Sequence, residues 1–116
     1  MDLLTKLQLK PGVTLAVVNP PEVLPAGLPV GNADAAEADA VLAFVRRRAD
    51  LDGVEPALAA ARADRAAWVA YPKAGQLGTD LNRDTLAAAL VERGGVRPVR
   101  QVALDGVWSA LRFRPA

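Results

Sequence analysis

A polar loop that follows an apolar strand holds many of the side chains in this chain that are able to bind or react. It lies in residues 68–83, which read WVAYPKAGQLGTDLNR. The candidate ligand-binding residues in this stretch are Tyr71, Lys73, Asp80, Asn82 and Arg83. Their hydroxyl, amide and charged groups are able to hydrogen-bond a polar ligand or to hold an anion. The stretch therefore predicts a binding loop.

The composition excludes several kinds of catalysis. The 116 residues include no cysteine and no histidine. Thiolate and imidazole nucleophiles, histidine general bases and the usual zinc sites therefore have no side chains to build them. Ser109 lacks a histidine that would activate it, and we interpret its neighbour Trp108 as a packing residue. The sequence predicts no catalytic residue, no metal site and no cofactor, and it favours a protein that is not an enzyme.

Length and charge favour one globular domain over residues 1–116. Fourteen basic and thirteen acidic residues give a formal net charge of +1, so nucleic acid and anionic membranes are not expected as partners. Charges at Asp2, Lys6 and Lys10 interrupt the N-terminal apolar residues, and no apolar run approaches the length of a membrane span. We expect a cytoplasmic protein.

Three continuous apolar runs predict strands that are covered on both faces, as in a parallel sheet. They span residues 13–18, 39–45 and 65–71. Two further strands, 99–104 and 107–113, flank Asp105-Gly106, which is the favoured centre of a tight type I′ hairpin turn. The last two strands should therefore be antiparallel to each other. The predicted fold class is a small three-layer α/β fold with a mixed sheet.

Two longer helices are expected between these strands. One spans about 50–62, and the other ends near residue 93, before Gly94-Gly95. The expected capping residues are Asp50 or Asp52 for the first helix and Thr79, Asp80 or Asn82 for the second. A short apolar stripe at 3–9 predicts one or two further helical turns. Four prolines obscure the pattern in 20–37, where a helical turn at 22–24 and a short edge strand at 28–30 are the open alternatives.

Several short motifs resemble those of a known family. They are LKPG at 9–12, DAVL at 39–42, WVAYPK at 68–73, TDLNR at 79–83 and WSALRF at 108–113. Together they resemble small bacterial proteins of unknown function that have a shortened S-adenosylmethionine-dependent methyltransferase fold, which is Rossmann-like. The resemblance covers nearly the whole chain. It implies a sheet of about five strands, in which the last strand inserts between the third strand and its own hairpin partner.

The turn after the first strand departs from the methyltransferase pattern. Those enzymes have a glycine-rich turn there, because only glycine lets backbone N–H groups approach the cofactor closely. Here the residues are VNPPE at 18–22, and the two prolines each lack an N–H donor. The sequence therefore argues against S-adenosylmethionine binding in the usual mode.

The carboxyl ends of parallel strands meet at one rim, so Asn19 and Arg46 should lie near Tyr71 and Lys73. Arg46 and Lys73 beside a helix N-terminus would hold a phosphate or a carboxylate. The plainer alternatives are that Lys73 is solvated, that Asp80 or Asn82 is a helix cap, and that Arg83 pairs with Asp84, with Glu92 or with the chain end. We interpret the chain as a non-enzymatic methyltransferase-like domain that binds a small anionic ligand or a protein partner at this rim. The alternative is a methyltransferase with a degenerate cofactor site, and a homodimer is left open.

Overall fold

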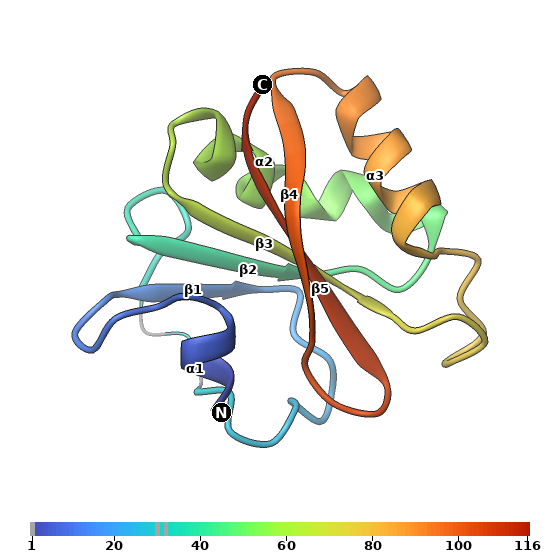
Figure 1. The fold of residues 1–116 in the computed structure, drawn as a ribbon, viewed down its shortest axis with the longest axis horizontal. Helices are drawn as coiled ribbons and strands as arrows, with labels where there is room; N and C mark the ends of the chain where they lie inside the picture. Colours follow the sequence, from blue (N-terminus) through green and yellow to red (C-terminus); the bar gives the residue numbers. More distant parts are fainter. Residues whose placement is uncertain (1, 30, 32) are drawn as a thin grey trace.

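A five-stranded mixed sheet forms the middle of the computed structural model, which describes residues 2–29, 31 and 33–116 (Figure 1). The strands are β1 (Leu15–Val18), β2 (Ala40–Phe44), β3 (Ala66–Pro72), β4 (Val96–Ala103) and β5 (Trp108–Pro115). Their order across the sheet is β1-β2-β3-β5-β4. β1, β2 and β3 are parallel, whereas β5 is antiparallel to both β3 and β4. The predicted α/β class and the antiparallel C-terminal hairpin are therefore confirmed.

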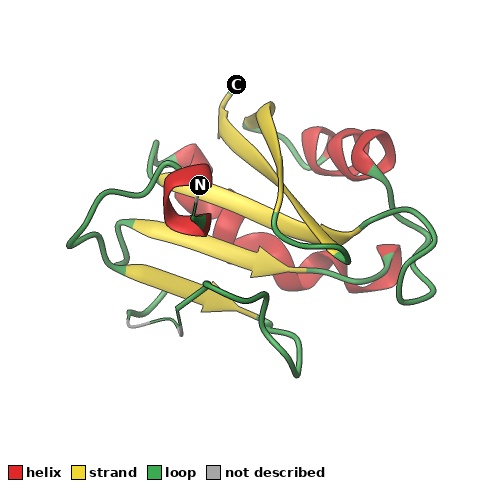
Figure 2. Cartoon of the chain, turned by 60° about the horizontal axis from the view of Figure 1, so that its bottom comes forward, coloured by secondary structure: helices red, strands yellow, loops and turns green. Residues whose placement is uncertain are grey.

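Helices cover the two faces of the sheet unequally (Figure 2). α2 (Glu55–Arg62) and α3 (Arg83–Glu92) pack on one face, and the short α1 (Leu3–Lys6) packs on the other. β2 is buried along its whole length. Alternate residues of β2 enter different cores, because successive side chains of a strand point to opposite faces. Val41 lies in the α2–α3 core, and Leu42 lies in the α1 core.

The sequence predicts a single helix over about 50–62, but the structure has two helices of different type in this region. A 3-10 helix, η1 (Arg48–Val54), comes first, and α2 begins only at Glu55, with Pro56 in its first turn. Proline is tolerated there because the first N–H groups of a helix have no intrahelical acceptor. Neither Asp50 nor Asp52 caps α2, whose N-cap is Val54, so that expectation is wrong. Asp52 instead forms an ion pair with Arg93 at 2.8 Å.

The boundaries of α3 follow the sequence signals closely. Asn82 is its N-cap, and the Asn82 side chain accepts a hydrogen bond from the backbone N–H of Thr85 at 2.9 Å. The Thr85 hydroxyl in turn accepts from the backbone N–H of Asn82, which completes a capping box. Gly94 and Gly95, with φ of 92° and 81°, end this segment in the left-handed region that favours glycine.

The turn between β4 and β5 is wider than a type I′ turn. Neither Asp105 nor Gly106 has the positive φ that a type I′ turn requires. The strands instead end at Ala103 and begin again at Trp108, with four residues between them. The Asp105 carboxylate accepts hydrogen bonds from the backbone N–H groups of Val107 and Trp108, each at 2.8 Å. The side chain of Asp105 thus stabilises this turn, in place of the type I′ backbone conformation that the sequence predicts.

The crossover from β1 to β2 is irregular. Residues 22 and 23 form bends and residue 24 has no regular structure, in place of the expected helical turn. Leu28 and Pro29 lie outside any strand, and residue 30, the rest of the expected edge strand, lies outside the described residues. Gly31 passes the exposed edge of the sheet so closely that a Cβ atom there would meet the backbone nitrogen of Val17 at 2.7 Å. Gly31 therefore lies against the sheet edge at β1, and the described residues of the crossover form no strand there.

Candidate functional site

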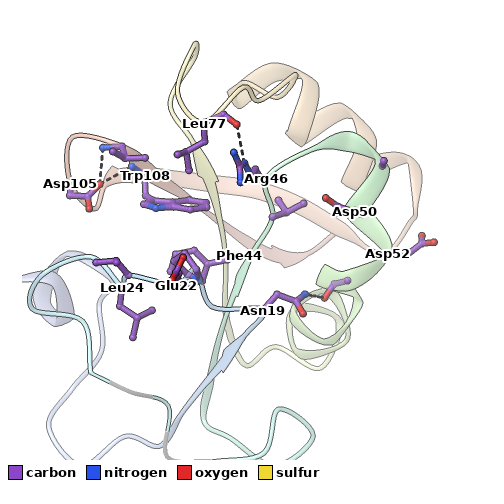
Figure 3. A pocket seen from close by; sticks show the side chains of 16 residues that line it. Asn19, Glu22, Leu24, Phe44, Arg46, Asp50, Asp52, Leu77, Asp105 and Trp108 are labelled. Carbon is purple, nitrogen blue, oxygen red and sulfur yellow. Dashed lines mark hydrogen bonds between the residues drawn. The ribbon is translucent and has the colours of Figure 1, made fainter.

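A pocket with a volume of about 880 Å³ opens beside the carboxyl ends of β1 and β2 (Figure 3). Its walls come from the loop after β1, from the end of β2 with η1, from Leu77 and from the hairpin loop before β5. Ligands of open parallel sheets bind beyond the carboxyl ends of the strands, and the pocket lies in that position. This pocket is the candidate binding site for a small molecule.

Two aromatic rings form the apolar floor of the pocket. The rings of Phe44 and Trp108 meet edge to face, with centroids 5.0 Å apart and an interplanar angle of 85°. Phe44 is 3% exposed and Trp108 is 6% exposed, so both rings are held firmly by the core. At the mouth, Val23 is 79% exposed and Leu77 is 40% exposed. Exposed apolar side chains above a rigid aromatic floor are typical of sites that bind the apolar part of a ligand.

The pocket lining contains more acidic than basic residues. Arg46 is the one basic residue in the lining of the described structure, against the carboxylates of Glu22, Asp50, Asp52 and Asp105. Two of these carboxylates are engaged elsewhere, because Asp52 pairs with Arg93 and Asp105 accepts from the hairpin backbone. Glu22 and Asp50 have no side-chain hydrogen bond or ion pair to another described residue. The pocket therefore presents one cation and two free carboxylates.

Arg46 is held in position by the loop after β3. Its Nε donates a hydrogen bond to the carbonyl oxygen of Leu77 at 2.9 Å, which leaves the two terminal nitrogens of the guanidinium for a ligand (Figure 3). The hydroxyl of Thr79 donates to the carbonyl oxygen of Arg46 at 2.6 Å. The carboxylate of Asp80 accepts from the backbone N–H of Arg48 at 2.9 Å. Three contacts thus fix this loop to the residues between the end of β2 and the start of η1.

Asn19 lies on the opposite wall and has a mainly structural contact. Its Nδ2 donates to the carbonyl oxygen of Gly53 at 2.8 Å, and its φ of 52° is left-handed. Asparagine tolerates this backbone conformation better than most residues. The side chain joins the end of β1 to η1.

The structure does not bring the other expected residues to the pocket. Tyr71 is 2% exposed and lies in the α2–α3 core, where its hydroxyl accepts a hydrogen bond from Gln101 at 2.7 Å. Burial raises the pKa of this hydroxyl. The reason is the alternation of β3, which directs residue 71 to the face that the longer helices cover. The sequence predicted that the Tyr71 hydroxyl would lie at the rim. This prediction is wrong, because the hydroxyl is buried on the other face of the sheet.

Lys73, Asp80, Asn82 and Arg83 also lie outside the pocket lining. The backbone N–H of Lys73 extends the sheet by donating to the carbonyl oxygen of Val107 at 2.7 Å. Asp80 and Asn82 bind backbone N–H groups, and Arg83 forms an exposed ion pair with Asp84 at 3.2 Å. Of the seven candidates, only Asn19 and Arg46 line the pocket.

The sequence analysis did not identify the aromatic floor or the free carboxylates. Phe44 stands at the end of a buried apolar run, and Trp108 follows a turn, so each has the pattern of an ordinary core residue. Glu22 lies in a segment whose path the sequence does not define, and Asp50 is one of the two residues interpreted as a helix cap. Phe44 ends a parallel strand two residues before Arg46, and that position is the signal that would have indicated a pocket residue.

In the described part of the chain, no group of three or more acidic side chains is placed to hold a metal ion. No helix in the described part of the chain is long and apolar enough to cross a membrane. In comparisons with known proteins, no family model matches the sequence, and the curated proteins give no significant match.

Proposed function

We propose that this chain is a non-enzymatic binding domain for a small organic ligand that has an apolar body and a single carboxylate or similar anionic group. The observation that carries the proposal is the position of Arg46 beside the Phe44–Trp108 floor, with its terminal guanidinium nitrogens unused. The apolar body would lie on the rings, and the anionic group would pair with the guanidinium. An arginine–carboxylate contact of this kind supplies both energy and orientation.

The two free carboxylates limit the charge of the ligand. Glu22 and Asp50 line the same pocket as Arg46, so a ligand with several negative charges would meet more repulsion than attraction there. A polyphosphate is therefore a poor ligand for this site. A singly charged acid fits, and so does an amino acid, whose ammonium group would face a carboxylate.

We also propose that the fold is a shortened relative of the Rossmann-like methyltransferase fold. The position of β5 between β3 and β4 supports this relationship, because it is the order that the sequence resemblance implies. The pocket beside β1 and β2 also favours the second candidate, a methyltransferase with a degenerate cofactor site. Asn19, Pro20 and Pro21 occupy the turn where such an enzyme would have its glycines, so we prefer the non-enzymatic function.

Isothermal titration calorimetry with two probes tests the preferred function. Phenylpropionate has an aromatic body and one carboxylate, and phenylpropionamide has the same body without charge. We expect the acid to bind about tenfold more tightly than the amide, since one good charged contact is worth about 1.4 kcal/mol. Arg46→Ala should remove this difference. Arg48→Ala is the matched control, because the side chain of Arg48 is exposed and outside the lining.

Titration with S-adenosylmethionine and S-adenosylhomocysteine separates the two candidate functions. Binding of either compound at micromolar concentration, with heat that disappears in a Trp108→Ala variant, would favour the methyltransferase. Equal binding of the acid and the amide would overturn the role of Arg46. Native mass spectrometry of the purified protein would show any ligand that is retained from the cell.

A further inference from the structure

Four arginines gather on one face of the C-terminal hairpin, which Figure 1 draws in orange and red. We call this surface the arginine face, and its members are Arg97, Arg100, Arg112 and Arg114. In the register of the hairpin, Arg97 lies opposite Arg114, and Arg100 lies opposite Arg112. An irregularity between Pro98 and Arg100 keeps both pairs on the same side of the sheet, since it inserts one extra residue.

The neighbouring residues in β4 and β5 show on which face of the sheet the arginines lie. Gln101 reaches Tyr71 in the α2–α3 core, and Val102 and Ala110 pack in the α1 core. The alternation of the strands therefore places the arginines on the α1 side. α1 is too short to cover the whole of this side, and the turn after it reaches only as far as Arg112, which bonds Gln8. The other three arginines are exposed.

This arrangement is unfavourable for the isolated chain. Like charges directly opposite each other on neighbouring strands destabilise a sheet. In the described part of the chain, Asp64 is the one carboxylate that pairs with the arginine face, at 3.3 Å from Arg114 and with both side chains exposed. The Nε of Arg112 is buried without a hydrogen-bond partner among the described residues. Burial, together with the charges of Arg114 and Arg100, lowers the pKa of Arg112.

We propose that the arginine face docks an acidic, extended segment of a partner protein. Carboxylates on such a segment would neutralise the opposed arginine pairs, and planar guanidinium groups suit carboxylates particularly well. Alternate side chains of an extended chain are about 6.8 Å apart, which matches the spacing of Arg112 and Arg114 on one face of β5. The face is separate from the pocket, because Trp108 begins β5 and Arg114 lies near its other end.

Nucleic acid fits this surface less well than a polypeptide. All five aromatic side chains of the protein are buried and none belongs to the arginine face, so this face offers bases no stacking surface. The net charge is only +1, which gives little long-range attraction to a phosphate backbone. A second copy of the chain fits poorly as well. β4 is the end strand of the sheet, but two such edges would bring arginines together, and Pro98 lacks the N–H that strand pairing needs.

Fluorescence anisotropy with a labelled glutamate oligomer tests the proposal at low ionic strength. We expect Arg100→Glu to weaken binding of the oligomer by at least about tenfold, because the variant replaces an attraction with a repulsion. Arg48→Glu is the matched control, since it changes the net charge equally at an exposed site outside the arginine face. It should weaken binding by less than about twofold, which is the size of effect that a distant, screened charge has.

Two further measurements keep the result interpretable. Thermal unfolding of Arg100→Glu and of the milder Arg100→Gln should show no loss of stability, because each substitution relieves the repulsion with Arg112. A labelled oligothymidylate should bind more weakly than the glutamate oligomer. The proposal is overturned if the wild-type protein does not bind the oligomer, if the two charge reversals weaken it equally, or if oligothymidylate binds more tightly.

Discussion

The side-chain nitrogen Nδ2 of Asn19 lies 2.8 Å from the carbonyl oxygen of Gly53 and donates a hydrogen bond to it. This contact joins the end of β1 to η1 and fixes two walls of the pocket relative to each other. Gly53 allows it, because a Cβ atom at that position would stand 2.7 Å from the same nitrogen. The shape of the pocket therefore depends on the fit between the side chain of Asn19 and the backbone of Gly53.

Two substitutions of Asn19 should separate the hydrogen bond from the backbone conformation. Asn19→Gly loses only the hydrogen bond, which is worth about 1 kcal/mol. Asn19→Ala loses the bond and must also adopt the left-handed φ of 52°, which costs about 1 kcal/mol more for a residue with a Cβ atom. Urea unfolding measures both free energies. Equal stability of the two variants would show that the backbone relaxes at this position.

Asp105 should be important for the hairpin and for the floor of the pocket. Its carboxylate accepts from the N–H groups of Val107 and Trp108, and the Trp108 ring packs on Phe44. Asp105→Ala should reduce the free energy of unfolding by about 2 kcal/mol, because it removes two hydrogen bonds to a charged acceptor. Chemical denaturation measures the loss, and the tryptophan emission, to which Trp68 and Trp108 both contribute, should shift as the Trp108 ring becomes less well held.

Asp105→Asn is the control for this effect. Its amide oxygen is still able to accept hydrogen bonds from both N–H groups, so this variant should keep more than half of the stability that Asp105→Ala loses. A full loss in Asp105→Asn would instead assign the effect to the charge of the carboxylate.

The strands of this fold follow from the sequence because their signals are local. A strand that is buried on both faces must be apolar at every position, and residues 40–45 and 66–71 meet this requirement. The crossover at 19–39 and the division between η1 and α2 were not predictable in the same way. Pro56 is compatible with the first turn of a helix or with a kink inside one, and only the packing of Leu51 and Val54 in the core decides between them.

The site was less predictable than the fold because it depends on which face each side chain takes. Asn19 and Arg46 could be placed from the parallel strands alone. Tyr71 could not, since a shift of one residue in a strand moves its side chain to the other face. Phe44 and Trp108 are 64 residues apart in sequence, and their contact exists only because β5 inserts between β3 and β4 and pairs Trp108 with Pro72.

Neighbouring residues at the start of α3 should differ sharply in their effect on stability. Asn82→Ala removes the acceptor for the Thr85 N–H and should cost about 1 kcal/mol, as is usual for an N-cap. Arg83→Ala removes only an exposed ion pair with Asp84 and should change stability by less than about 0.5 kcal/mol. Thermal and urea unfolding of the two variants test this difference. A larger loss from Arg83→Ala would give Arg83 a role that its position does not indicate.

Tyr71 should make the stability of the protein depend on pH in the alkaline range. It is the single tyrosine of the chain, so the absorbance of tyrosinate reports on it alone. Burial raises its pKa in the folded state above the ordinary value of about 10, and the positive charge of Arg83 and the hydrogen bond with Gln101 offset this only in part. The folded protein therefore retains the proton in a pH range where the unfolded chain has already lost it.

Because the pKa of Tyr71 is higher in the folded state than in the unfolded chain, the free energy of unfolding decreases as the pH rises through this range. The contribution of Tyr71 to stability is fully present below the unfolded pKa of about 10, and it falls as the pH rises from there through the folded pKa. Tyr71→Phe should remove this part of the pH dependence, although it also loses the 2.7 Å hydrogen bond with Gln101. Absorbance titration of the folded protein and urea unfolding at several alkaline pH values measure the two effects. A tyrosinate titration at the ordinary pKa would mean that the hydroxyl is open to water, contrary to its burial between the sheet and the helices.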